Sequence, residues 1–272
     1  DHHKDIAVQG SLTYIHSNQI YLGRIMRLLV LILLSSISCS KAPEIKNGED
    51  LIHAMNTMYK SKWYKTFTFE QKTSFYRNDS LMREETWLEA IKIPGLLHIK
   101  QGDLSHGNAM MFKDDTMYVF RNHQQVVARH NVHPLLVLGF DVYHDDPANT
   151  IQKLKDLGYD LSKMYSDKWQ GRDVYVVGTD KADAKAKQFM IDKEHLYFVK
   201  LSEEVKTPQA TFLSSTEFNK YERLGGGWVA PEVLFKRDGK VGMKEEYSKM
   251  QVPDHLDDAI FDPKQVDSAK WW

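Results

Sequence analysis

The stretch that decides the fold is residues 171–201, GRDVYVVGTDKADAKAKQFMIDKEHLYFVKL. It contains three short runs rich in Val, Ile, Phe and Tyr, the residue types that favour strands: 173–178, 187–191 and 196–201. The four residues between the second and third runs (192–195, DKEH) have the length of a common hairpin loop. The stretch therefore predicts neighbouring antiparallel strands, without the intervening helices that a parallel sheet needs.

The same pattern extends in both directions from this stretch. Thr66 to Phe69 alternates strictly between polar and apolar residues, as a half-buried strand does, and Asp238-Gly239 is a strong hairpin signal. Further strands are expected at 82–92, 96–101, 108–113, 116–121, 126–129, 209–221, 228–237 and 240–250. Helices are expected only near 48–60, at 134–143 (a short helix or a lid loop), and from Asp146-Pro147 to Gly158.

Strands joined by short turns, with few helices, predict an α+β protein that is mainly antiparallel β. A long antiparallel sheet must curl or be covered to bury its apolar face. We therefore expect an unclosed, curved barrel of about 10–11 strands, with a few helices as a lid over an apolar cavity. A core filled by side chains is the alternative, and the sequence leaves both open. No linker or internal repeat divides the chain, so residues 49–272 are expected to form one domain.

The alternation of the strands also predicts which residues face such a cavity. The candidate lining residues are aromatic or Met residues at alternating strand positions: Phe67, Phe69, Trp87, Met111, Tyr118 and Phe198. The candidate lid residues come from the apolar run 134–143 (PLLVLGFDVY): Leu135, Leu136, Leu138 and Phe140.

A second apolar stretch, residues 26–43 (MRLLVLILLSSISCSKAP), indicates a compartment. Its apolar run is about 10 residues, too short to span a membrane, and it follows arginines, as in a secretory signal. The run ends at Cys39, the only Cys in the chain, in a segment that resembles a bacterial lipobox. We expect 26–39 to be a lipoprotein signal peptide with its lipobox Cys, Cys39 to carry the lipid, and 40–48 to be a tether. We interpret residues 1–25 as a non-native or over-long extension.

Other chemistry is poorly supported by the sequence. The formal net charge of −1 gives no basic excess, so we expect no nucleic-acid partner. His130, His133, His144 and Asp145 could assemble a metal site, but their spacing fits no known pattern, and we expect no metal and no cofactor.

Adjacent acidic residues such as Glu84-Glu85 point to opposite faces of a strand, so they do not form a catalytic pair. We expect a binding protein and not an enzyme, and residues 225–227 (GGG) to be a hairpin turn.

Three segments carry a resemblance to a known family: TFTFEQ (66–71), GRDVYVVG (171–178) and KQFMIDKEHLYFVKL (187–201). With the long final meander, they resemble the LolA/LolB superfamily of lipoprotein localisation factors over most of residues 46–262. The resemblance implies an unclosed barrel whose apolar cavity receives acyl chains, in a lipid-anchored variant held by Cys39. Residues 134–140 (PLLVLGF) would be the only counterpart of the protruding apolar loop of LolB.

The resemblance implies an envelope lipoprotein that binds acyl chains or lipidated proteins and acts in lipoprotein sorting or lipid transport. Ser40, directly after Cys39, favours the outer membrane facing the periplasm, and we expect a monomer. The alternative is a module of the same fold that has lost carrier activity and regulates an envelope partner by binding or sensing.

Overall fold

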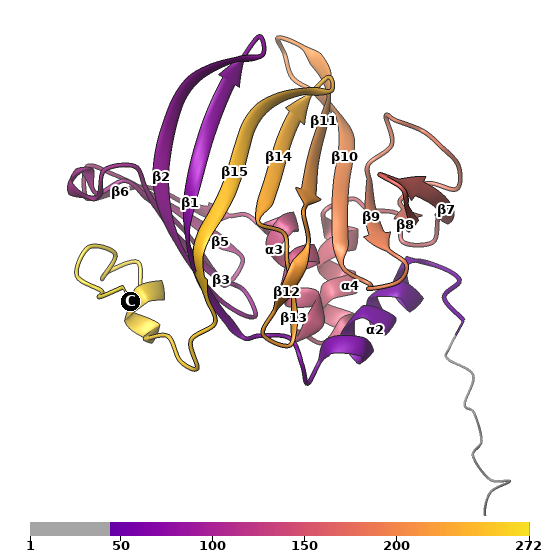
Figure 1. The fold of residues 1–272 in the computed structure, drawn as a ribbon, viewed down its shortest axis with the longest axis horizontal. Coiled ribbons are helices and arrows are strands. Elements are labelled where there is room, and N and C mark those ends of the chain that lie inside the picture. The colour runs from indigo at the N-terminus through magenta and orange to yellow at the C-terminus, as the bar shows by residue number, and fades with distance from the viewer. Residues whose placement is uncertain (1–43, 272) are drawn as a thin grey trace, which may run out of the picture. The chain divides into compact units, whose positions relative to one another are not determined.

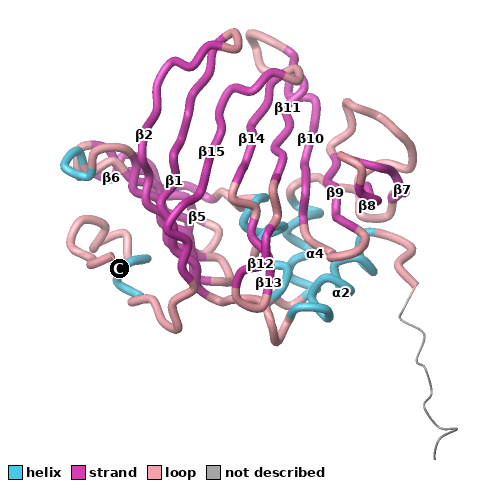
Figure 2. The backbone as a smooth tube through the Cα atoms, in the orientation of Figure 1, coloured by secondary structure: helices cyan, strands magenta, loops and turns pink. Residues whose placement is uncertain are grey.

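The computed structural model describes residues 44–271, so the predicted lipid-attachment residue Cys39 and the signal segment lie outside the described residues. These residues form one thirteen-stranded antiparallel sheet and a separate two-stranded ribbon (Figure 1). Figure 2 shows the α-helices gathered on one face of the curved sheet, with short helical turns elsewhere, near β6 and near the C-terminus. The helices are α2 (Gly48–Tyr59), α3 (Pro134–Gly139) and α4 (Pro147–Asp156), with 3₁₀ turns η1 (Leu104–His106), η2 (Asp141–Tyr143) and η3 (Asp258–Phe261).

The sheet is built from two meanders that meet at the first and last strands. Its order is β6-β5-β4-β3-β2-β1-β15-β14-β11-β10-β9-β8-β7, and β12 pairs with β13 in the ribbon. The bounds are β1 (Thr66–Arg77), β2 (Ser80–Lys92), β3 (Leu96–Gln101), β4 (Ala109–Lys113), β5 (Thr116–Arg121), β6 (Gln124–His130), β7 (Met164–Trp169), β8 (Arg172–Val177), β9 (Gln188–Asp192), β10 (Phe198–Lys206), β11 (Thr211–Asn219), β12 (Glu222–Leu224), β13 (Gly227–Val229), β14 (Glu232–Arg237) and β15 (Lys240–Gln251).

The fold class predicted from the sequence is confirmed: the sheet is antiparallel, curved and unclosed, with β6 and β7 as its two edges. Because these two edge strands are consecutive in the chain, the connection between them must cross from one edge to the other. It does so through α3, η2 and α4, which pack with α2 against the sheet. Strand β7 was not predicted, because the centre of its sequence MYSDKW is polar and none of its residues is buried.

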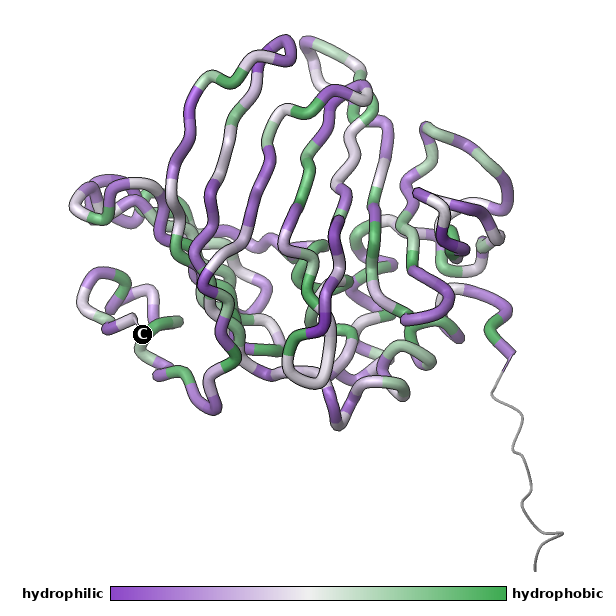
Figure 3. Tube along the Cα trace, viewed as in Figure 1, coloured by the Kyte–Doolittle hydropathy of each residue, from purple (hydrophilic) through white to green (hydrophobic). Residues whose placement is uncertain are grey.

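Side-chain alternation explains why the strands form a two-sided sheet. Figure 3 shows hydrophobic and hydrophilic residues alternating along the long strands. Strand β2 is exposed in its first half and buried in its second. The end of the sheet where β2 begins therefore extends beyond the core. Among the described residues, no helix has the length and apolar content that crossing a bilayer requires.

The run Gly225-Gly226-Gly227 forms the turn of the β12–β13 ribbon, as predicted. A Cβ on Gly226 would lie 1.7 Å from the carbonyl oxygen of Lys62, and one on Gly227 would lie 2.4 Å from the Trp63 ring. The glycines therefore allow the ribbon to pass directly over the chain that leads from α2 into β1.

The C-terminal segment covers the face of β2–β4 that points away from the helices. Ile260 and Phe261 of η3 pack with Ala90 there, and Val266 packs with Met111. Beneath this segment His98 is fully buried, and its Nδ1 lies 2.6 Å from the carbonyl oxygen of Ile260. Burial lowers the pKa of His98 from 6.5 to about 4, so the ring is neutral and donates from Nδ1.

This depressed pKa predicts how stability depends on pH. Between pH 6.5 and 4 the unfolded chain takes up a proton at His98 that the folded chain resists, so folding stability falls as the pH falls. At about 1.4 kcal/mol per pKa unit, the loss approaches about 3 kcal/mol. Replacing His98 by Asn keeps an N–H donor and removes the titration, so denaturant unfolding of His98→Asn should vary less between pH 7 and pH 4. The exposed His53→Asn variant is the control, and a pH profile of His98→Asn equal to that of the wild type would contradict the prediction.

Candidate binding cavity

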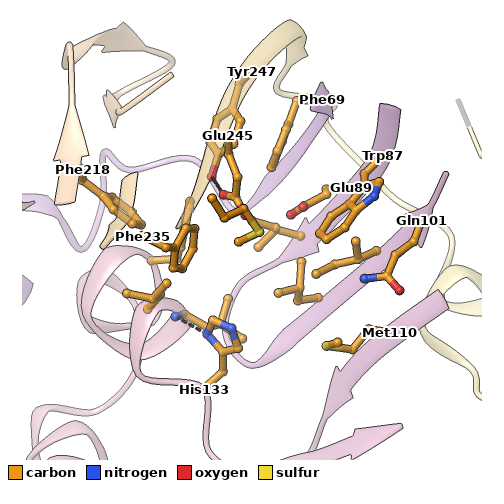
Figure 4. A pocket seen from close by; sticks show the side chains of 17 residues that line it. Phe69, Trp87, Glu89, Gln101, Met110, His133, Phe218, Phe235, Glu245 and Tyr247 are labelled. Atoms are coloured by element: carbon orange, nitrogen blue, oxygen red, sulfur yellow. Dashed lines mark hydrogen bonds between the residues drawn. The ribbon is translucent and has the colours of Figure 1, made fainter. Parts of the chain in front are cut away.

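A cavity of about 240 Å³ lies between the sheet and α3 (Figure 4). Strands β1–β4, β11, β14 and β15 form its walls, and residues 133–140 close one side. Its size is just below the roughly 300–1,000 Å³ of typical small-ligand pockets. Its walls are mainly aliphatic and aromatic: Phe69, Trp87, Ile91, Leu97, Ile99, Met110, Leu135, Leu136, Phe140, Phe218, Phe235, Met243 and Tyr247. Such walls favour an apolar ligand, because contact with them removes hydrocarbon from water.

Helix α3 is the wall that does not belong to the sheet. Pro134 occupies its first turn, and the Nδ1 of His133 accepts a hydrogen bond from the backbone N–H of Leu136 at 3.2 Å. Burial lowers the pKa of His133 to about 4, which keeps the ring neutral in this role. At the other end of the helix, Gly139 packs so closely that an added Cβ would lie 3.3 Å from the Phe218 ring.

The chain that follows α3 is fixed by Asp141. This residue is 2% exposed, and its Oδ1 accepts a hydrogen bond of 2.9 Å from the backbone N–H of Gly95, in the turn between β2 and β3. Burial raises the pKa of Asp141 from 3.8 to about 7, partly offset by the Gly95 hydrogen bond and by the charge of Lys153. Asp141 thus joins the segment that closes the cavity to the sheet.

Two carboxylates interrupt the apolar walls. Glu89 of β2 is 6% exposed and Glu245 of β15 is 8% exposed, and both line the cavity. Burial raises the pKa of Glu245 to about 7. Burial, together with the charge of Glu245, raises the pKa of Glu89 well above its ordinary value. The hydroxyl of Tyr247 donates to Oε2 of Glu245 at 3.3 Å.

Of the six residues predicted to line the cavity, two lie at its wall and four do not. Phe69 and Trp87 lie at the cavity wall, whereas Phe67 stacks behind Phe69 at 4.6 Å in the core. Phe198 is also outside the wall, packed edge-on against Phe218 at 4.9 Å.

Met111 and Tyr118 lie on the opposite face of the sheet, toward the C-terminal segment, because Met110 takes the cavity-facing position in β4. Among the candidate lid residues, Leu135, Leu136 and Phe140 line the cavity, and Leu138 is fully buried in the core beside it.

The sequence analysis missed the two carboxylates, because it looked for acidic pairs among chain neighbours, and Glu89 and Glu245 are far apart in the sequence. Glu89 lies opposite Phe69 and Glu245 lies opposite Thr73, on the two strands that flank β1. Only the pairing of the first and last strands places them in one cavity. For Glu89 the available signal was an isolated Glu within the apolar half of β2, whereas Glu245 lies between Lys244 and Glu246 and gave no such signal.

The candidate metal residues are used for other contacts. His133 caps α3, while Nε2 of His144 lies 3.1 Å from the carbonyl oxygen of Trp63. Within residues 44–271, no group of three or more His, Cys, Asp or Glu side chains is arranged to hold a metal ion.

Comparison with solved structures identifies proteins of the same fold. A DUF1329 family protein from Desulfovibrio piger aligns with a TM-score of 0.53 and 16% identity, over 80% of this chain and 96% of its own. A domain described as an outer membrane lipoprotein-sorting protein domain, from Vibrio parahaemolyticus, aligns with a TM-score of 0.52 and 15% identity, over 82% of this chain and 98% of its own.

A LolA superfamily protein from Nitrosomonas europaea aligns with a TM-score of 0.49 and 13% identity, over 80% of this chain and 98% of its own. No protein-family model and no curated protein matches the sequence. The similarity is therefore one of fold, and at that level the resemblance to lipoprotein-sorting proteins predicted from the sequence is confirmed.

The raised pKa of Asp141 gives a testable prediction about the closing segment. Between pH 3.8 and about 7 the folded chain holds a proton that the unfolded chain releases, so stability falls as the pH rises through this window. At about 1.4 kcal/mol per pKa unit, Asp141→Asn should gain up to about 4 kcal/mol over the wild type at pH 8 and little at pH 4. Urea unfolding at both pH values measures this gain, with the exposed Asp180→Asn as control. A variant that is less stable than the wild type at pH 8 would contradict the prediction.

Proposed function

We propose that this protein binds the acyl chains of lipids or lipidated proteins in the cavity under α3, and that it does so in the bacterial envelope. The observation that carries the proposal is the apolar cavity itself, which lies between a curved sheet and a short helix. Each buried methylene contributes about 0.8 kcal/mol, so a short length of chain gives useful affinity without directional chemistry.

The fold comparison supports the class of ligand. The Vibrio domain of the same fold is described as lipoprotein-sorting. The alignment between the two covers nearly all of that domain and most of this chain. We infer a corresponding role here in lipoprotein sorting or lipid transport, as a binding protein and not as an enzyme. Helix α3 is the element whose displacement would admit a chain, because its Leu135 and Leu136 line the cavity and α3 is the part of the wall that does not belong to the sheet.

Attachment to the membrane is the second part of the proposal. Cys39 would carry the lipid anchor, residues 40–48 would tether the domain, and Ser40 favours the outer membrane, with a monomeric domain facing the periplasm. Glu44 is the first described residue and α2 begins at Gly48, so the proposed tether leads directly into the folded domain.

Filling the cavity should block binding. Met243 is a half-buried residue of the cavity wall, and Met243→Trp places an indole in the space. Displacing about two methylenes, at about 0.8 kcal/mol each, should weaken the binding of a single-chain fatty alcohol by about tenfold. Titration with 1-decanol and native mass spectrometry of co-purified lipid measure the effect. Met82→Trp on the exposed part of β2 is the matched control; equal binding by the two variants would count against the cavity as the site.

The anchor can be tested in bacterial cells. Growth with a clickable fatty-acid analogue should label the full-length protein, and Cys39→Ala should remove the label while leaving the domain folded. The same substitution at Ser38 serves as a control for effects on export. Equal labelling of the wild type and Cys39→Ala would show that the lipid is not at Cys39.

A further inference from the structure

We propose that the cavity selects amphiphiles with a cationic ammonium head, which is held between Glu89, Glu245 and the aromatic rings beside them. The inference rests on the proposed acyl-binding function and adds the chemistry of the head group to it. It starts from two carboxylates that line an otherwise apolar cavity (Figure 4). Glu89 and Glu245 are more than nine-tenths buried, so water solvates them poorly.

No protein cation neutralises this pair. Among the described residues, neither Glu89 nor Glu245 takes part in an ion pair, and no Lys or Arg lines the cavity. The other titratable groups at its wall are His133, which burial keeps neutral, and Tyr247, whose hydroxyl donates to Glu245. Within the described part of the chain, the side chain of Glu89 accepts no hydrogen bond.

The same sheet contains another buried carboxylate, Glu217, which is paired with lysines and serves for comparison. Glu217 of β11 is 5% exposed, and two lysines hold it: Nζ of Lys236 at 2.7 Å and Nζ of Lys200 at 3.6 Å. Glu89 and Glu245 are buried to nearly the same degree without such partners. A buried charge is normally paired, so the missing positive charge points to the ligand.

The aromatic side chains complete a site for a cation. Trp87 of β2 and Tyr247 of β15 both lie opposite Gln71 of β1, so the three residues share the cavity-facing side. Phe69 adds a third ring at the wall, and its centroid lies 4.1 Å from that of Tyr247. Aromatic faces attract ammonium groups, and quaternary ammonium ligands are recognised by such rings together with carboxylates. The Oε1 of Gln71 is buried and has no hydrogen-bond partner among the described residues, which adds another acceptor.

Proton balance follows from this arrangement. Without a ligand, the raised pKa values of both carboxyl groups favour a bound proton near neutral pH. A ligand ammonium close to them stabilises the ionised form, so binding releases the proton to solvent. An anionic head forms no charge pair here, because its own charge favours the protonated form of both carboxyl groups, so it binds more weakly than an ammonium head.

The test compares three amphiphiles of matched chain length on the purified protein by isothermal titration calorimetry: decyltrimethylammonium, 1-decanol and decanoate, each below its micelle concentration. We expect the ammonium compound to bind about tenfold or more tightly than the alcohol, and decanoate most weakly. Repeating the titration in buffers of different ionisation enthalpy should show proton release for the ammonium compound only.

The variant Glu89→Gln/Glu245→Gln keeps the size of both side chains and removes their charge. It should lose the preference for decyltrimethylammonium over 1-decanol, and release no proton. The single variants Glu89→Gln and Glu245→Gln provide the same comparison if the double variant unfolds. The matched control is Glu246→Gln, the next residue of β15, whose carboxylate is paired with Lys72 and Lys244.

The outcomes separate the inference from the proposed function. Binding of 1-decanol without a preference for the ammonium compound, or a preference that survives in the double variant, overturns the cationic head and leaves acyl binding intact. Failure of all three amphiphiles to bind the wild-type protein overturns the proposed function and, with it, this inference.

Discussion

The structure depends on an aromatic cluster that holds the helices against the sheet. The rings of Trp63 and Tyr143 stack with centroids 3.7 Å apart, and Tyr59 meets both rings edge-on. Nε1 of Trp228 donates to the Tyr59 hydroxyl at 3.1 Å. The four residues come from α2, the chain leading into β1, η2 and the β12–β13 ribbon. Because the sheet is open, no ring of strand hydrogen bonds can hold this side, so side-chain packing does.

This cluster also determines which part of the closing segment can move. Tyr143 is fixed by the rings and Asp141 by the Gly95 N–H, so η2 is attached to the sheet at two points. Helix α3 has only apolar packing and the cap at His133, without a polar contact to the opposite wall. Local opening requires least free energy where few contacts are broken, so a ligand would enter by displacing α3 rather than η2.

Local patterns were enough to predict the architecture. The alternation in β1, the Asp238-Gly239 turn and the Asp146-Pro147 helix start all lie where the sequence placed them. The cavity wall was harder, because a shift of one residue exchanges the two faces of a strand, as at Met110 and Met111. The carboxylate pair could not be predicted from local patterns, since Glu89 and Glu245 come together only when β15 pairs with β1.

A cavity made only of hydrocarbon binds chains but does not orient them. Burial of methylenes is non-directional, so an acyl chain could enter such a space in either direction and with any head group. Burying Glu89 and Glu245 costs folding free energy, because the two carboxyl groups lose contact with water without gaining a cationic partner. Their position beside Trp87 and Tyr247 gives the cavity one polar region, and a polar region fixes the end at which a head group sits. In the proposed function, affinity and orientation would therefore come from different residues of the same wall: the aliphatic side chains would supply the first, and the carboxylates would supply the second.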